Sequence, residues 1–122
     1  MQVSQVIAQV LKQEGVKQLF CFPSTPVMDA CAEAGIRPII ARQERVAGNM
    51  ADGFSRVSNG QRIGVVTVQQ NAGAENCFAG LAQAHTDSSP ILVLPGNWSI
   101  HTGSLPPNFS AAASFRQQTK WA

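Results

Sequence analysis

An unbroken run of mostly apolar residues in the middle of the chain, IGVVTV at 63–68, restricts the fold more than any other feature. A strand with one face in water alternates apolar and polar side chains, whereas this run is apolar on both faces. Strands of this kind are typical of parallel sheets that helices cover on both sides. The sequence therefore predicts a buried strand inside an α/β sheet.

Helical patterns alternate with short apolar runs along most of the chain. The predicted helices are 3–14, 26–34, 43–57 and 74–86, and the predicted strands are 16–22, 36–40, 63–68 and 90–96. Pro38 restricts the second strand to an edge of the sheet, and the fourth is predicted to be buried. After Gly96 the pattern allows at most one more helix. This alternation predicts an open, mainly parallel sheet with helices on both faces.

The chain of 122 residues has the length of one domain with one hydrophobic core, and it contains no repeat or linker. Only 13% of its residues are charged, against about 25% in typical domains, which predicts a surface that packs against partners. The net charge of +2 without basic runs argues against nucleic acid and membrane partners. Three cysteines without metal-type spacing predict reduced core thiols in a cytoplasmic protein.

Three polar clusters follow predicted strands: PSTP at 23–26, RQE at 42–44 and QQNAGAEN at 69–76. Because the carboxyl ends of parallel strands lie at one edge of the sheet, these clusters predict a ligand pocket there. The alternative is structural, since turns after strands are generally polar. The turn at 69–76 lacks a phosphate-binding glycine motif, and the histidines lack metal-type spacing, so no metal ligand is predicted.

The stretch ARQERVAGNMADGF at 41–54 places Glu44 between Arg42 and Arg45. Glu44 could stabilise the first turn of the helix by about 0.3–1 kcal/mol through the helix dipole, pair with an arginine, or take part in catalysis. The local pattern alone favours the first role. Asp52, further along the same helix, is interpreted as a surface acid. The small residues of this helix predict close packing, because each interior glycine otherwise costs about 1 kcal/mol relative to alanine.

The sequential order of these clusters resembles that of a known protein family. The order is more specific than any single cluster. FCFPST, then RQERVAGNMADGFSRVSNG, then IGVVTVQQNAGAENCFAGLAQAHTDSSPILVLPG is similar to the amino-terminal pyrimidine-binding domain of thiamine-diphosphate enzymes, in particular the acetolactate-synthase-like group. The resemblance covers residues 3–96 and is most specific in the block at 42–56. It implies decarboxylation or carboligation of 2-oxo acids.

The resemblance also implies roles for individual residues. Glu44 matches the glutamate that hydrogen-bonds a ring nitrogen of the cofactor's aminopyrimidine and so activates the cofactor. This role needs a site without water, with Arg42 and Arg45 pointing away from it. The residues implied to bind the pyrimidine end of thiamine diphosphate are Pro23, Ser24, Thr25, Glu44, Asn71, Ala72, Gly73 and Asn76.

The chain departs from the family pattern at several of these positions. Asn71 and Ala72 stand where the family has glycine and proline, Glu75 replaces a threonine, and Ser24 and Thr25 replace glycines. These departures put side chains where relatives have bare backbone. Asn97 falls where many acetolactate synthases carry a glutamine.

The motif that holds magnesium and the diphosphate in this family, Gly-Asp-Gly with a later asparagine, does not occur in the 122 residues. We therefore expect magnesium and the diphosphate to be held by another domain of the same enzyme. The resemblance further implies that residues 1–122 form a single domain that lacks its last elements and has an uncovered sheet edge. The isolated chain is not expected to be active.

Other classes of function remain open at this point. The chain could be a non-catalytic α/β interaction module or an inactive fragment. A receiver-like signalling domain would need a cluster of acids at the strand ends, where only Glu44 is found. The small residues of the helix at 43–57, together with the paired packing of the family, predict a homo-dimer or a higher oligomer.

Overall fold

The computed structural model describes residues 1–23, 25–103 and 105–122. Ser24, which the sequence places in the cofactor site, lies outside the described residues. The helices are α1 (Val3–Gln13), α2 (Pro26–Glu33), α3 (Glu44–Val57), α4 (Ala72–Thr86) and α5 (Ala111–Phe115), and the strands are β1 (Gln18–Cys21), β2 (Arg37–Ile40), β3 (Gly64–Val68) and β4 (Ile91–Pro95). All the predicted elements are present, and α4 begins two residues before the predicted start.

The four strands form one parallel sheet in the order β2-β1-β3-β4. β2 lies at an edge, as the proline at position 38 predicts. All five residues of β3 are buried, because β3 lies between β1 and β4 and helices cover both of its faces. The fold class predicted from the sequence is therefore confirmed.

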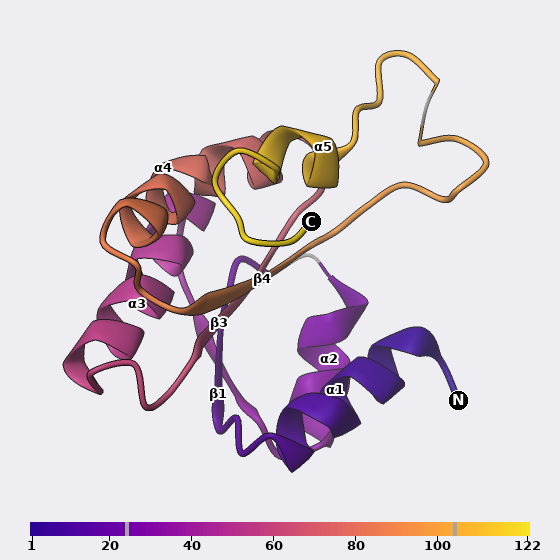
Figure 1. Ribbon diagram of the computed structural model, residues 1–122. Helices are drawn as coiled ribbons and strands as arrows, with labels where there is room; N and C mark the ends of the chain where they lie inside the picture. Colours follow the sequence, from indigo (N-terminus) through magenta and orange to yellow (C-terminus); the bar gives the residue numbers. More distant parts are fainter. Residues whose placement is uncertain (24, 104) are drawn as a thin grey trace.

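Helices cover the sheet in two layers (Figure 1). α1 and α2 pack on one face, and α3, α4 and α5 pack on the other. The sheet thus divides the apolar interior into two clusters. Side chains from β3 enter both clusters in turn, with Val65 on the α1/α2 face and Val66 on the α3/α4 face.

Glycines allow α3 to pack closely on its neighbours. A Cβ atom at Gly48 would lie 2.9 Å from the Cys77 Sγ atom, and a Cβ atom at Gly80 would lie 3.0 Å from the backbone of Gly48. Gly64, at the start of β3, lies against the backbone of Ala51 in the same way. The predicted close packing of the small-residue helix α3 is therefore present. It occurs within the chain, against α4 and β3.

Asp52 is not the surface acid that the sequence suggested, because only 6% of it is exposed. Arg56 Nε donates to both carboxylate oxygens of Asp52 at 2.9 Å, and the same guanidinium group contacts Asp87 at 2.7 Å. Asp52 therefore helps to join the end of α3 to the end of α4. In the sequence, an acid one turn before an arginine is typical of an exposed helix surface. The burial of Asp52 becomes apparent only from the packing of α4 against α3.

The prediction that the fourth strand is buried was also wrong. The residues of β4 are half-buried or, at Leu92, exposed. The reason is its position, since β4 pairs with β3 on one side and is the last strand of the described sheet. An apolar sequence alone does not distinguish an edge strand from a central one.

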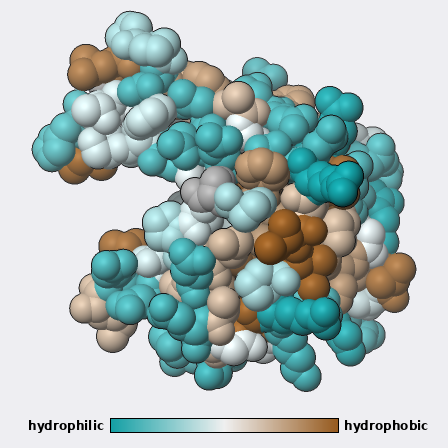
Figure 2. Space-filling model, turned by 180° about the vertical axis from the view of Figure 1, so that it is seen from behind, coloured by the Kyte–Doolittle hydropathy of each residue, from teal (hydrophilic) through white to brown (hydrophobic). Residues whose placement is uncertain are grey.

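A cleft of about 500 Å³ opens on the α1/α2 side of the sheet, between the start of α1 and the end of β4. Figure 2 shows the corresponding hollow between the body of the molecule and the segment that projects after β4. Val3 and Ile7 of α1 line one wall, and Val93 and Pro95 of β4 line another. The helices in the described parts of the chain are all too short or too polar to cross a membrane.

Candidate functional site

Glu44 is the first residue of α3 and follows the short connection from β2. Its position at the helix start agrees with the structural role that the sequence favoured, since a carboxylate there is stabilised by the helix dipole. Yet only 8% of Glu44 is exposed, which is unusual for an acid that serves only the helix dipole. The residues around its carboxylate therefore decide what it can do.

Two residues from the first turn of α4 surround the Glu44 carboxylate. The Asn76 side-chain nitrogen Nδ2 donates to Glu44 Oε2 at 2.7 Å. Gly73 lies on the side of Oε1, where a Cβ atom would stand 3.0 Å from Oε1 and 2.6 Å from the Cβ atom of Gln69. Only glycine tolerates this close approach of Gln69 and Glu44. The structure thus brings together Glu44, Gly73 and Asn76, three of the residues that the sequence singled out.

Cys77 lies between α3 and α4, where its Sγ atom packs against Gly48. Burial and, to a smaller extent, the charge of Glu44 raise the pKa of its thiol to about 12. The thiol therefore stays neutral at physiological pH and adds no second negative charge beside the carboxylate. Cys21 and Cys31 are also buried and free, so the prediction that the cysteines are reduced core thiols is confirmed.

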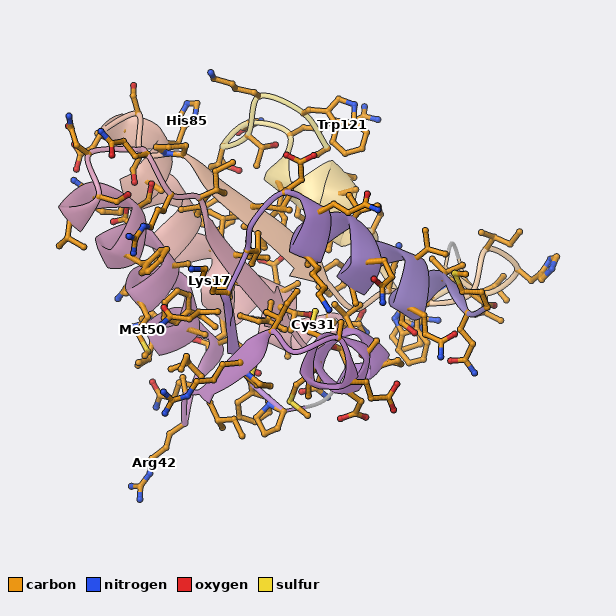
Figure 3. All side chains as sticks on the ribbon, turned by 90° about the horizontal axis from the view of Figure 1, so that it is seen from below. Lys17, Cys31, Arg42, Met50, His85 and Trp121 are labelled. Atoms are coloured by element: carbon orange, nitrogen blue, oxygen red, sulfur yellow. The ribbon has the colours of Figure 1, made fainter. Side chains whose placement is uncertain are left out.

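The two arginines beside Glu44 in sequence do not neutralise it. Arg42 and Arg45 are exposed, and Figure 3 shows Arg42 extending away from the body of the molecule. Among the residues that the structure describes, the only partner of the Glu44 side chain is Asn76. Oε1 consequently has no partner among the described contacts, while an amide donor is fixed on the other oxygen.

The turn that leads into α4 carries a backbone distortion. Asn71 has φ 53° and ψ −113°, a region that non-glycine residues rarely adopt. Its Oδ1 atom accepts a hydrogen bond of 2.7 Å from Trp98 Nε1. Asn71, which the sequence implicated in cofactor binding, thus contacts the segment after β4, and Ala72 beside it is exposed at the start of α4.

The first polar cluster lies elsewhere. Thr25 is buried on the α1/α2 side of the sheet, where its hydroxyl lies 3.0 Å from that of Thr67, and Thr67 in turn donates to the carbonyl of Leu94 at 2.7 Å. Both threonines line the cleft between α1 and β4. Pro23 is exposed. The described contacts of this cluster therefore link β1, β3 and β4 and do not reach Glu44.

Three contributors to these sites escaped the sequence interpretation. The sequence did contain a signal for the buried hydrogen bond of Thr67, because a hydroxyl in an otherwise apolar strand implies a buried partner. Cys77 follows Asn76 directly, but its sequence context is that of a core residue. The sequence contains no signal for the contact of Trp98, since this residue lies in a segment without periodicity.

The site has the chemistry of a proton-sharing carboxylate rather than of a metal centre. No cluster of three or more potential metal ligands occurs in the described part of the chain. A buried carboxylate that is held on one oxygen by an amide and has no described partner on the other can accept a hydrogen bond from, or share a proton with, a ring nitrogen. Together with a parallel sheet and a position at the strand ends, this describes an α/β protein with a candidate ligand-binding carboxylate at the edge where such sheets bind ligands.

Comparison with known proteins agrees with this class. Residues 1–116 match the family model "Thiamine pyrophosphate enzyme, N-terminal TPP binding domain", and the chain belongs to this family. Its fold and the order of its clusters are those expected from the resemblance seen in the sequence.

The curated relatives are much longer proteins. The chain is 36% identical over 97 residues to the acetolactate synthase isozyme 3 large subunit of Escherichia coli, covering 76% of this chain and 17% of that protein. It is 39% identical to the acetolactate synthase large subunit of Lactococcus lactis, covering 76% and 16%, and 37% identical to a sulfoacetaldehyde acetyltransferase of Alcaligenes xylosoxydans, covering 75% and 15%. The chain thus spans about a sixth of the length of these relatives.

The residues present fit the pyrimidine end of thiamine diphosphate, the cofactor that the family binds. The test is the Glu44 carboxylate, which has one oxygen unengaged among the described contacts and lies beside Gly73, where a side chain would collide with Oε1. The buried thiol of Cys77, near enough for the charge of Glu44 to raise its pKa, stays neutral and adds no charge beside the carboxylate.

Proposed function

We propose that this chain supplies the pyrimidine-binding half of a thiamine-diphosphate enzyme that acts on 2-oxo acids by decarboxylation or carboligation. The observation that carries the proposal is the Glu44 carboxylate, which is buried, held at Oε2 by Asn76 and open at Oε1 beside Gly73. The names of the relatives, acetolactate synthases among them, support the class of reaction.

Each residue of the site has a separate task in this proposal. Glu44 Oε1 shares a proton with the ring nitrogen of the bound pyrimidine. Asn76 holds the carboxylate in place, and Gly73 brings no side chain against Oε1. Thiamine diphosphate, when bound, supplies a carbon nucleophile for chemistry at the carbonyl of the 2-oxo acid. General acid–base help of this kind contributes about 10²- to 10⁴-fold to a rate.

We propose that the other half of the site comes from a diphosphate-binding domain of the same enzyme, which would hold magnesium and the diphosphate. The support is that no group of potential metal ligands is found in the ranges the structure describes, while the relatives are about six times longer. The chain alone is therefore expected to be inactive.

The experiment that tests this proposal is a reconstitution. The chain is mixed with a separately produced diphosphate-binding domain of the same family, Mg²⁺ and thiamine diphosphate, and cofactor binding is measured by calorimetry. Consumption of pyruvate, 2-oxobutyrate and phenylpyruvate is measured in parallel. Binding and turnover that need both proteins would support the proposal. A mixture that binds no more cofactor than the diphosphate-binding domain alone would instead support a non-catalytic interaction module.

We also propose that the chain self-associates through the outer face of α3. The face of α3 opposite to α4 carries Val46, Met50, Gly53 and Val57 at helical spacing. Val46 and Val57 are 42% and 87% exposed, and a Cβ atom at Gly53 would contact nothing within 4 Å. An apolar stripe on the outside of an amphipathic helix is typical of an interface.

Sedimentation velocity at micromolar concentration tests the self-association. The wild-type chain is expected to sediment as a dimer or a larger oligomer, and Val57→Lys is expected to sediment as a monomer, because a charge would be buried in the interface. Val10→Lys is the matched control, since Val10 is 50% exposed on α1, on the other side of the sheet. A monomeric wild type would contradict the proposal.

A cytoplasmic location completes the proposal. It is supported by three buried cysteines that are all free, which is usual in a reducing compartment.

A further inference from the structure

The turn before α4 has a backbone shape that glycine normally provides. The Gly73 N–H group donates to the carbonyl of Gln70 at 3.3 Å, which closes a four-residue turn, and the first central residue, Asn71, has φ 53° and ψ −113°. These angles are those of a type II′ turn, in which the first central position has positive φ and is dominated by glycine. An asparagine there is strained, so other contacts must hold it.

Trp98 supplies such a contact from a distant part of the chain. Its indole Nε1–H group, which can only donate, gives a 2.7 Å hydrogen bond to Asn71 Oδ1. Two residues earlier, the backbone at Gly96 presses on the same turn, because a Cβ atom there would lie 3.1 Å from the Gln70 backbone nitrogen. The segment after β4 thus contacts the turn at two adjacent points.

The turn in its strained shape leads directly to the Glu44 carboxylate. Its last residue, Gly73, borders Glu44 Oε1, and Asn76, three residues further on, donates to Oε2. A rotation at Asn71 would move the start of α4, and with it both contacts.

We propose that Asn71 and Trp98 form a pair of positioning residues that fix this turn and thereby hold Gly73 and Asn76 against Glu44. The link from the turn to cofactor binding rests on the proposed function, whereas the link between the two side chains does not. The pair explains how this chain accommodates a side chain where its relatives are expected to have glycine. Trp98 acts through Asn71 and contributes no group to the reaction.

The test uses the variants Trp98→Phe, Asn71→Gly and the double variant of the full chain. The first readout is hydrogen exchange of the Gly73 amide without cofactor. Trp98→Phe removes the donor but keeps an aromatic ring, and it is expected to speed exchange about three- to tenfold, the effect of one lost hydrogen bond. Asn71→Gly in the same chain is expected to recover most of the lost protection, because glycine adopts the turn without help. Trp121→Phe, at a tryptophan that is 90% exposed, is the control and should change nothing.

The second readout is the affinity for thiamine diphosphate in the reconstituted mixture. Trp98→Phe is expected to weaken binding about three- to tenfold, and the double variant is expected to bind like Asn71→Gly. If Trp98→Phe leaves Gly73 exchange unchanged, or if Asn71→Gly rescues neither readout, the pairing is wrong. A double variant with restored exchange but still weak binding would show that Trp98 contacts the ligand itself. Absence of cofactor binding in the wild type would overturn the proposed function, while the exchange data would still decide the pairing.

Discussion

The two faces of the sheet are covered in different ways. On the α3/α4 face, Gly48, Gly64 and Gly80 bring backbone against backbone, and the Glu44 site lies at one end of this tight packing. On the α1/α2 face, the helices leave a cleft of about 500 Å³, and the polar contact of Thr25 with Thr67 joins strands. The comparison indicates that the buried carboxylate of the proposed site belongs to the tightly packed face, whereas the polar contacts on the open face join strands.

The largest effect is expected where a glycine on the tight face gains a methyl group. In Gly64→Ala the new Cβ atom would overlap the backbone of Ala51, and the free energy of unfolding should fall by about 3 kcal/mol. Urea unfolding measures the change. The control is Gly53→Ala on the outer face of α3, where the Cβ atom has open space. It should raise stability by about 0.5–1 kcal/mol, and equal effects of the two changes would contradict the described packing.

A second change separates structural from functional polar contacts. Thr67→Val keeps the shape of the side chain but leaves the Leu94 carbonyl without its donor, so the free energy of unfolding should fall by about 1–2 kcal/mol. Affinity for thiamine diphosphate in the reconstituted mixture should stay the same, because Thr67 lies on the other face. A loss of affinity without loss of stability would place the cofactor in the open cleft.

The corresponding change on the tightly packed α3/α4 face should lower the affinity for the cofactor. Asn76→Ala removes the donor to Glu44 Oε2, and affinity for thiamine diphosphate should fall about tenfold, because a hydrogen bond to a charged group is lost. Calorimetry on the reconstituted mixture measures the affinity. Unchanged binding would mean that Asn76 does not position the carboxylate.

The smallest effect concerns pH. Because the pKa of the Cys77 thiol is raised from 9.0 to about 12 on folding, its contribution to stability is complete below pH 9 and is lost as pH rises towards 12. Between pH 9 and pH 10 the loss should be about 1 kcal/mol. Thermal or urea unfolding of Cys77→Ala should show a shallower decline over that interval than the wild type. The same slope in both proteins would contradict burial of this thiol.

Most of the fold could be predicted from sequence, because periodicity reports which faces of an element are apolar. The apolar run of β3 and the proline of β2 placed one strand inside the sheet and one at its edge, as observed. The pattern could not show that β4 is partly exposed or that Asp52 is buried. Both depend on which neighbours lie beside an element, and neighbours far apart in sequence leave no local signal.

The candidate site was predictable in part for the same reason. Glu44 begins α3, and Gly73 and Asn76 lie near the start of α4; both helices follow carboxyl ends of strands in one parallel sheet and cover the same face, so their meeting follows from topology. Thr25 follows β1 as well, but its side chain is directed to the opposite face, where it meets Thr67. The contact between Asn71 and Trp98 joins a turn to a segment without regular structure, and neither composition nor spacing indicates it.

The rate of 2-oxo acid consumption by Glu44→Gln in the reconstituted mixture tests the central claim most directly. Glutamine keeps the size of the side chain and can still accept from Asn76, but it cannot take up a proton from a ring nitrogen. The matched control is Glu75→Gln, an exposed acid in the first turn of α4. The account predicts a rate at least about 100-fold below the wild type for Glu44→Gln and an unchanged rate for Glu75→Gln. A Glu44→Gln variant as fast as the wild type would contradict it.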